Sequence, residues 1–191
     1  MDDKGKIDSS KIIFFLGSSG SGKNTIINEL ANSLIASGKQ VIIPRRLITR
    51  ESHKSEDFIS IDNESFLDKI SEKQFILYWF IYNTYYGYLE NDILPFLTGD
   101  YFILLNISRS IAFEAKKIFS NSNFVEIKTT KYNAIRRIEN RKRESPSMLN
   151  DRIKRMDKKI TLPPLLLSLD NNTEEDITKN VKFLLKKLLP N

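Results

Sequence analysis

The chain has 191 residues, of which 40% are hydrophobic and 28% are charged, and its formal net charge is +6 at pH 7. This length and composition are ordinary for one α/β domain with a good core. The absence of cysteine excludes a disulfide framework and a thiolate metal site. Residues 1–10 are polar and charged, unlike a signal peptide, and the apolar runs are too short to span a membrane. We therefore expect a cytoplasmic protein without a membrane partner.

The excess of positive charge has two interpretations, a nucleic-acid surface or an enzyme for phosphorylated molecules. The basic residues gather in a few places, chiefly residues 45–50 and 136–155, instead of spreading over the chain. This clustering favours an enzyme that handles several phosphates. We expect a small phosphorylated molecule as partner, no nucleic acid, and a monomer or homodimer.

The N-terminal part of the sequence predicts a strand, a loop, a helix and a second strand. Lys11–Leu16 is an apolar run of strand length. From Asn24 to Ser37 apolar residues recur at helical spacing, and Gly38 ends the helix. Val41–Ile43 predicts a second buried strand, which Pro44 ends. This order is typical of the start of a parallel sheet.

The rest of the chain continues this alternation. Further strands are expected at Phe58–Ile61, Phe75–Phe80, Tyr101–Leu105, Phe124–Ile127 and Leu165–Ser168, with a turn or short strand at Tyr85–Tyr88. Further helices are expected at Asn63–Ile70, Leu89–Leu97, Ser110–Phe119, Tyr132–Arg143, Leu149–Lys159 and Glu174–Leu188. The pattern predicts a doubly wound parallel sheet in one domain, 1–191, with a core of about 11–44 and 99–191 and an inserted substrate-binding region of about 45–98.

The loop after the first strand has the pattern of glycine, four residues, glycine and lysine, with a helix following at once. Glycines let the backbone N–H groups of the loop converge on phosphate oxygens, and the helix adds the positive end of its dipole. Lys23 is expected to bridge the β- and γ-phosphates of ATP. A glycine-rich turn without a ligand is the alternative, and the flanking strand and helix argue against it. The expected ATP-binding residues are Gly17, Ser18, Ser19, Gly20, Ser21, Gly22, Lys23, Asn24 and Thr25.

The residue after the lysine of such loops is normally Ser or Thr, whose hydroxyl binds Mg²⁺, but here it is Asn24. An amide oxygen can bind Mg²⁺ directly or hold a coordinating water, with Thr25 as a cap or helper. Mg²⁺ is therefore expected as a cofactor with ATP, and Asn24 is its candidate ligand.

Two groups of arginines follow. Residues 45–50 come directly after the second strand, at the edge of a parallel sheet where ligands bind, and guanidinium groups suit phosphates; a solvated basic loop is the alternative. The second group, residues 136–143 with Arg152 and Arg155, surrounds the interruption Ser145-Pro146-Ser147. Some of these side chains are ordinary helix surface. The rest predict a hinged lid, about 141–150, that brings positive charge to the transferring phosphoryl group and excludes water.

These motifs resemble the guanylate kinase family, in the order phosphate loop, Thr49-Arg50, Tyr85-Tyr86-Gly87 and arginine lid. Within it the chain is similar to the ribose 1,5-bisphosphate phosphokinase group of phosphonate metabolism. Residues 46–50 resemble that group's Arg-Tyr-Ile-Thr-Arg, residues 106–109 its Asn-Gly-Ser-Arg, and residues 138–144 its Leu-Glu-Asn-Arg-Gly-Arg-Glu. The resemblance runs from about Lys11 to Leu188 and implies the P-loop nucleoside-monophosphate-kinase fold.

Guanylate kinases resemble one another in placing a Glu before the Tyr-Tyr-Gly turn, to bind guanine. Here Phe75–Tyr82 contains no carboxylate, and the positions of other base contacts hold Arg46, Tyr88 and Asn106. Buried N–H groups of a base would be left unpaired in such a pocket, at a cost of about 1–3 kcal/mol each. The sequence also departs from the family at Glu51, which stands where a Pro is common, and lacks its second substrate arginine; His53 and Lys54 lie nearby.

The resemblance therefore implies ATP-dependent phosphorylation of ribose 1,5-bisphosphate to 5-phospho-α-D-ribose 1-diphosphate. The alternatives are a guanylate kinase, a non-catalytic guanylate-kinase-like binding module and, more distantly, a nucleic-acid-binding ATPase; the intact Gly22-Lys23 and basic lid argue against a scaffold. The implied catalytic residues are Lys23, Arg137, Arg141, Arg143 and Arg152. The implied acceptor-binding residues are Arg46, Arg50, Glu56, Tyr86 and Arg109.

Overall fold

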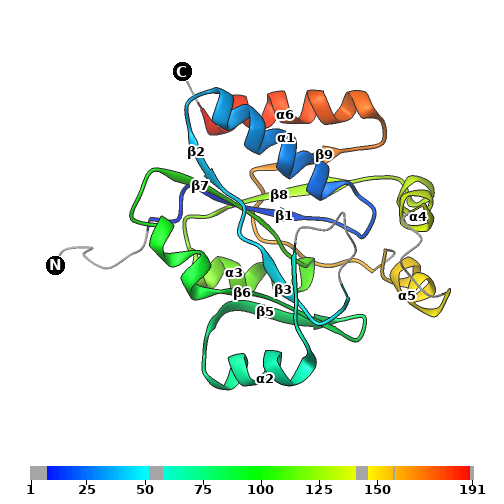
Figure 1. Ribbon diagram of the computed structural model, residues 1–191. Coiled ribbons are helices and arrows are strands. Elements are labelled where there is room, and N and C mark those ends of the chain that lie inside the picture. The colour runs from blue at the N-terminus through cyan, green and yellow to red at the C-terminus, as the bar shows by residue number, and fades with distance from the viewer. Residues whose placement is uncertain (1–7, 52–57, 141–145, 157, 190–191) are drawn as a thin grey trace.

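The computed structural model describes residues 8–51, 58–140, 146–156 and 158–189, in which the strands form two sheets (Figure 1). The larger sheet is parallel, in the order β2-β7-β1-β8-β9. Its strands are β2 (Gln40–Ile42), β7 (Tyr101–Asn106), β1 (Ile12–Leu16), β8 (Asn123–Lys128) and β9 (Leu167–Asp170). The predicted α/β fold with a parallel sheet is confirmed.

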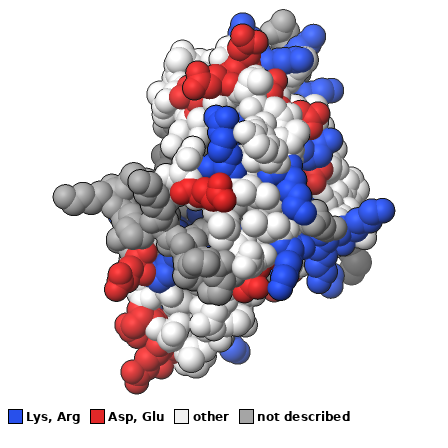
Figure 2. All heavy atoms as spheres, turned by 90° about the vertical axis from the view of Figure 1, so that its right-hand side faces the viewer, with Lys and Arg blue, Asp and Glu red and all other residues white. Residues whose placement is uncertain are grey.

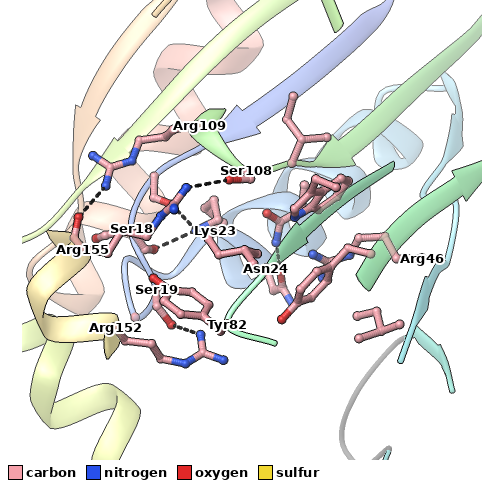
Figure 3. Close-up of a pocket in the computed structure, with 18 of the residues that line it drawn as sticks. Ser18, Ser19, Lys23, Asn24, Arg46, Tyr82, Ser108, Arg109, Arg152 and Arg155 are labelled. Atoms are coloured by element: carbon pink, nitrogen blue, oxygen red, sulfur yellow. Dashed lines mark hydrogen bonds between the residues drawn. The ribbon is translucent and has the colours of Figure 1, made fainter. Parts of the chain in front are cut away.

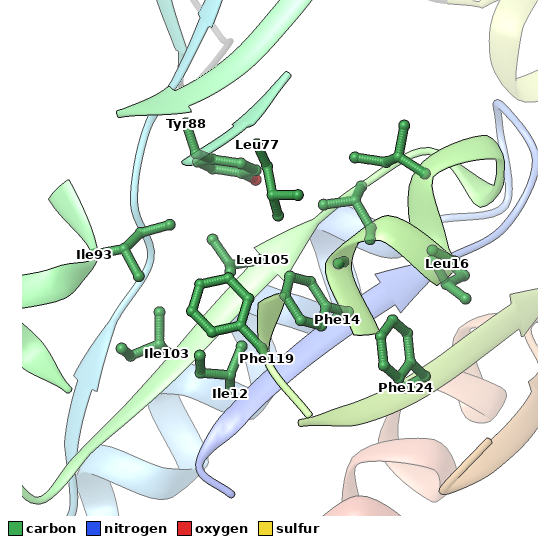
Figure 4. Close-up of a cluster of buried hydrophobic side chains, with 14 of the residues drawn as sticks. Ile12, Phe14, Leu16, Leu77, Tyr88, Ile93, Ile103, Leu105, Phe119 and Phe124 are labelled. Atoms are coloured by element: carbon green, nitrogen blue, oxygen red, sulfur yellow. The ribbon is translucent and has the colours of Figure 1, made fainter. Parts of the chain in front are cut away.

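The central strand β1 is buried on both faces because every one of its residues is apolar. Phe14 and its alternate neighbours point to a cluster that includes Leu105, Phe119 and Phe124 (Figure 4). Phe15 points to the opposite cluster, which the helices α1 and α6 cover. Two-faced burial of this kind is what a near-continuous apolar run produces in a parallel sheet.

The helices pack on both faces of the larger sheet. α1 (Lys23–Ala36) and α6 (Glu174–Leu188) lie on one face, and α3 (Ala112–Ile118) lies on the other with the second sheet (Figure 1). α4 (Lys131–Glu139) and α5 (Pro146–Met156) lie together at one side of the molecule. No helix among the described residues is long and apolar enough to cross a membrane.

The second sheet lies within the predicted inserted region and has the order β4-β3-β6-β5. It has its own small cluster of Leu47, Phe66 and Phe75, and α2 packs on it. Its elements are β3 (Arg46–Ile48), β4 (Phe58–Ser60), α2 (Asn63–Ser71), β5 (Phe75–Ile81) and β6 (Thr84–Leu89). The division of the chain into core, inserted region and lid stays a prediction.

The prediction of a helix at Leu89–Leu97 is wrong. Strand β6 extends to Leu89, and the N–H of Glu90 still donates to the carbonyl of Gln74 at 2.9 Å. Two 3₁₀ turns, Glu90–Asp92 and Leu94–Phe96, then follow. Pro95, which lacks an N–H, prevents a continuous helix here.

Several other elements also differ from the sequence prediction, among them α4, which ends at Glu139 and not at Arg143. Arg46–Ile48, expected only as a basic segment, forms strand β3 between β4 and β6. The last strand is Leu167–Asp170 and so lies two residues beyond its predicted start. Helix α5 begins at Pro146 itself, because a helix tolerates proline in its first turn.

The Tyr88→Phe substitution tests how the two sheets are joined. The buried Tyr88 hydroxyl of β6 donates to the carbonyl of Asn106 and accepts from its N–H, both at 3.1 Å. We expect its loss to lower the free energy of unfolding by about 1–3 kcal/mol in urea denaturation. Tyr78→Phe, at a side chain 42% exposed on β5, is the matched control. An equal effect of both substitutions would contradict this role of the Tyr88 hydroxyl.

Candidate active site

A cavity of about 350 Å³ opens at the carboxyl edge of the larger sheet (Figure 3). Its walls are the phosphate loop after β1, the segment after β7, strands β3, β5 and β6 of the second sheet, and the C-terminal part of α5. Ligands of parallel α/β sheets bind at this edge, because the strand ends and the loops that follow them meet there.

The phosphate loop depends on two glycines with positive φ, Gly20 at 76° and Gly22 at 87°. A Cβ on Gly20 would lie 2.4 Å from the carbonyl oxygen of Ala134, so only glycine fits. Helix α1 begins directly after Gly22, which makes no side-chain cap, and its first turn holds no acidic residue. The N–H groups of that turn and the positive end of the helix dipole therefore suit an anion such as a phosphate group.

Lys23 closes the loop from inside. Its Nζ donates to the carbonyls of Gly17 at 2.9 Å and Ser18 at 2.8 Å, and to the buried hydroxyl of Ser21 at 3.3 Å. Lys23 also lines the cavity. Its charge is thus held at the phosphate-loop wall of the cavity.

Arg137 of α4 holds the same loop from behind. Its Nη1 donates to the carbonyls of Asn171 at 2.9 Å and Gly20 at 3.3 Å, and its Nη2 donates to the carbonyl of Asn172 at 3.3 Å. Burial lowers the pKa of the Arg137 guanidinium below its ordinary value. Asn171 adds a bond from Nδ2 to the carbonyl of Ser21 at 2.8 Å. Arg137 does not line the cavity, so its contacts favour a positioning role over the catalytic role predicted from the sequence.

The second sheet contributes two arginines and an aromatic pair. Arg46, on β3, and Arg50, just after it, both line the cavity. The Arg50 guanidinium lies 4.9 Å from the ring centroid of Phe58. Tyr86 stacks on Trp79 at 5.4 Å between ring centroids, and both side chains line the cavity. Strand pairing therefore brings together residues that are far apart in the sequence.

Three more arginines meet on the opposite side of the cavity (Figure 3). Arg152 donates from Nη1 to the Ser19 hydroxyl at 2.8 Å, and Arg155 donates from Nη2 to the Ser108 hydroxyl at 3.5 Å. Arg109 donates from Nη2 to the carbonyl of Arg155 at 3.4 Å. Burial lowers the pKa of Arg109, and the nearby charge of Arg155 lowers it further, while Glu126 acts in the opposite direction. An anion bound here would relieve this repulsion.

The outer surface near this site is also basic. Figure 2 faces the side of the molecule that carries α4 and α5, and Lys and Arg side chains gather along the right of that view. Among the described residues that line the cavity there is one lysine, five arginines and no acidic side chain. The cavity is therefore suited to a ligand with several negative charges.

The candidate magnesium ligand, Asn24, is exposed, and its Oδ1 accepts a hydrogen bond from Nδ2 of Asn106 at 2.6 Å. Within the described ranges no group of three His, Cys, Asp or Glu side chains lies close enough to hold a metal. This donor set fits Mg²⁺ bound chiefly through substrate phosphates, with amide oxygens or waters as further ligands.

Comparison with known proteins agrees with this geometry. A model of the guanylate kinase family matches residues 9–188. The chain belongs to the guanylate kinase family. The crystal structure of guanylate kinase from Anaplasma phagocytophilum has the same fold, with a TM-score of 0.65 and 19% identity over 93% of this chain and 84% of that one.

Several ribose 1,5-bisphosphate phosphokinases are similar to this chain. The enzyme PhnN of Bradyrhizobium diazoefficiens is 26% identical over 80% of this chain and 76% of its own length. The enzyme PhnN of Rhodopseudomonas palustris is 29% identical over 78% of this chain and 76% of its own length. Membership of a kinase family supports phosphoryl transfer from ATP, typically with Mg²⁺.

The structure places most of the predicted site residues around this cavity of the guanylate kinase fold. Ser21 and Thr25 are not among its lining residues, and Thr25 is exposed. The predicted residues Glu56, Arg141 and Arg143 lie outside the described residues, as do His53 and Lys54. Those that line the cavity are Gly17, Ser18, Ser19, Gly20, Gly22, Lys23, Asn24, Arg46, Arg50, Tyr86, Arg109 and Arg152.

Among the cavity-lining residues that were not predicted as site residues are Tyr82, Ser108 and Arg155. Arg155 belongs to a basic run, but its position in the run does not show which helix face turns inward. Tyr82 follows the aromatic residues of β5, and nothing in its spacing marks it as a residue of the turn. Burial raises the pKa of Tyr82, against the influence of Arg152 and Arg155.

The Arg137→Ala substitution tests the support behind the phosphate loop. It would leave the carbonyls of Gly20 and Asn171 without this donor, so we expect a loss of stability of about 1–3 kcal/mol. A looser loop should also raise the dissociation constant of ATP about tenfold. Arg136→Ala, at the exposed neighbouring position, should change neither value in calorimetry and thermal unfolding. A normal ATP affinity with reduced turnover would instead return Arg137 to a catalytic role.

Proposed function

We propose that this chain transfers the γ-phosphoryl group of ATP to the 1-phosphate of ribose 1,5-bisphosphate, giving ADP and 5-phospho-α-D-ribose 1-diphosphate. The observation that carries the proposal is the lining of the cavity, in which Lys23 and five arginines face one another without an acidic side chain among the described lining residues. A bisphosphate acceptor and a triphosphate donor bring the negative charge that such a cavity needs.

The donor is assigned to the phosphate loop. The N–H groups at the start of α1 and the charge of Lys23 hold the ATP phosphates. Arg137 and Asn171 keep the loop in its binding conformation from outside. Mg²⁺, when bound with ATP, would neutralise phosphate charge, and the amides of Asn24 and Asn106 are the groups of this chain that would hold it or its waters.

The acceptor is assigned to the second sheet and the segment after β7. Arg46 and Arg50 supply planar donors for one phosphate, with Tyr86 beside them, and Arg109 supplies charge from the other wall. An oxygen of the 1-phosphate then attacks the γ-phosphorus while the bond to the β–γ bridging oxygen breaks and ADP leaves. A phosphate oxygen is already ionised at neutral pH, so positioning and charge stabilisation do the catalytic work without a general base.

The environment of Tyr88 supports an acceptor without a base. Its side chain is buried, and its hydroxyl is engaged by both the N–H and the carbonyl of Asn106. It is therefore not available to pair with a nucleobase. Leu77 and Trp79 on the facing strand β5 are also buried and offer no carboxylate. A guanine would find few acceptors for its N–H groups here.

Guanylate kinase activity remains the second candidate, because the family model and the similar solved structure both carry that name. The experiment is ADP release from ATP and Mg²⁺ with ribose 1,5-bisphosphate and GMP offered separately. We expect turnover with the sugar bisphosphate and none with GMP. Quenching or enhancement of Trp79 fluorescence measures acceptor binding independently, since Trp79 is the only tryptophan and lines the cavity.

Lys23→Met is the control for that experiment, with circular dichroism to confirm that the variant folds. Turnover that needs Lys23 and GMP would establish the second candidate. If neither acceptor gives Lys23-dependent turnover, the chain is a binding module or uses another acceptor, and the proposal fails.

The Arg152→Ala substitution tests charge stabilisation during transfer. Arg152 contacts the hydroxyl of Ser19 in the phosphate loop and faces the cavity. We expect turnover to fall about 100-fold, because the developing charge loses a fixed cation. The dissociation constant of ATP should change far less. Lys154→Ala, at an exposed position of the same helix, is the control. Equal losses of turnover and ATP affinity would show a role in ground-state binding only.

A further inference from the structure

The turn between β5 and β6 carries an unusual residue. Ile81 and Thr84 pair across the two strands, so the turn consists of Tyr82 and Asn83 alone. Both residues have φ of 53°, the positive φ pattern of a type I′ turn. Asn tolerates this conformation and Gly prefers it, but a bulky aromatic residue is strained in it. Such strain often accompanies a functional role.

The ring of Tyr82 faces α5. The guanidinium carbon of Arg152 lies 4.8 Å from its ring centroid, and that of Arg155 lies 5.9 Å from it. Figure 3 shows Tyr82 beside Arg152 and Ser19 at the cavity. Cations attract the face of an aromatic ring, more strongly where water is partly excluded, as it is around this half-buried side chain.

Packing in a hydrophobic core does not account for the strained position. The strand residues Ile81 and Tyr86 pack against the cluster under the second sheet. Tyr82 is in none of the hydrophobic clusters formed by the described residues. Among the described residues, the guanidinium groups of Arg152 and Arg155 lie over its ring, and these contacts can offset the strain of the turn.

Three segments meet through this contact. Arg152 reaches the Ser19 hydroxyl of the phosphate loop with Nη1 while its guanidinium covers the Tyr82 ring. Arg155 reaches the Ser108 hydroxyl after β7. The tip of the acceptor-binding sheet thus touches the helix whose arginines face the ATP-binding loop.

We propose that Tyr82 is a positioning residue that seats the arginine face of α5 across the cavity, so that Arg152 points at the phosphate loop. The part of this inference that concerns turnover rests on the proposed function. The part that concerns the order of α5 does not depend on which acceptor is used.

Two substitutions separate the ring from the turn. Tyr82→Phe keeps the ring. Tyr82→Asn removes it and places at this positive φ a residue that tolerates the conformation, so the hairpin keeps its stability. Hydrogen–deuterium exchange of residues 149–156 without ligand measures the order of α5. We expect Tyr82→Asn to raise this exchange about fivefold with the melting temperature unchanged or higher, and Tyr82→Phe to match the wild type.

Kinetics supply the second measurement. We expect Tyr82→Asn to lower kcat about tenfold, with a smaller change in the KM for ATP. The loss of one partly desolvated cation–π contact corresponds to a change in rate of about this size. Tyr82→Phe should keep kcat at the wild-type value. In the Arg152→Ala background, Tyr82→Asn should lower kcat little further, because the two side chains act through one contact.

The proposal is overturned if α5 exchanges normally in Tyr82→Asn, or if Tyr82→Phe loses as much activity as Tyr82→Asn, which would assign the effect to the hydroxyl. A parallel fall in melting temperature for Tyr82→Asn would show a purely structural role and overturn it as well. If the wild-type chain turns over neither acceptor, the proposed function fails, and exchange in α5 alone decides the role of Tyr82.

Discussion

The burial of strand β1 on both faces is the constraint on which the rest of this structure depends. Parallel pairing with β7 and β8 fixes both edges of the strand, and two hydrophobic clusters fix its faces. The end of β1 is therefore a rigid point, and the phosphate loop starts there. Lys23 holds the loop from inside, and Arg137 and Asn171 hold it from outside. The backbone conformation of this loop leaves room only for glycine at Gly20.

The second constraint is electrostatic. Five arginines and a lysine line one cavity, and no acidic side chain lies among its described lining residues. Burial lowers the pKa of Arg109, and the nearby charge of Arg155 acts in the same direction. Folding keeps these charges close only because β strands, α5 and the turn after β7 each hold one or two of them from a different direction. The arrangement costs stability without a ligand and favours a polyanionic one.

The second sheet supplies one wall of the cavity in this family fold. Its strand β6 places Tyr86 toward the cavity and Tyr88 into the core, where the Tyr88 hydroxyl binds the end of β7. Its turn carries Tyr82 to α5. One short hairpin thus contributes to the cavity wall, to the joint between the sheets and to the contact with Arg152.

The sequence by itself determined the parts of the protein that depend on local chemistry. The apolar run of β1, the glycine pattern and the helical spacing of α1 specify the phosphate loop without reference to the rest of the chain. The helix predicted at Glu174–Leu188 likewise matches the observed bounds of α6.

The tertiary structure decided what depends on distant partners. Arg46–Ile48 is a strand because β4 and β6 pair with it, and Leu89–Leu97 is not a helix because β6 and Gln74 hold its start extended. The tertiary structure also decided the direction in which each arginine side chain points. Arg137 turns to loop carbonyls and Arg155 to the cavity, since the packing of α4 and α5, and not the spacing of charges along the chain, sets which face of a helix points inward.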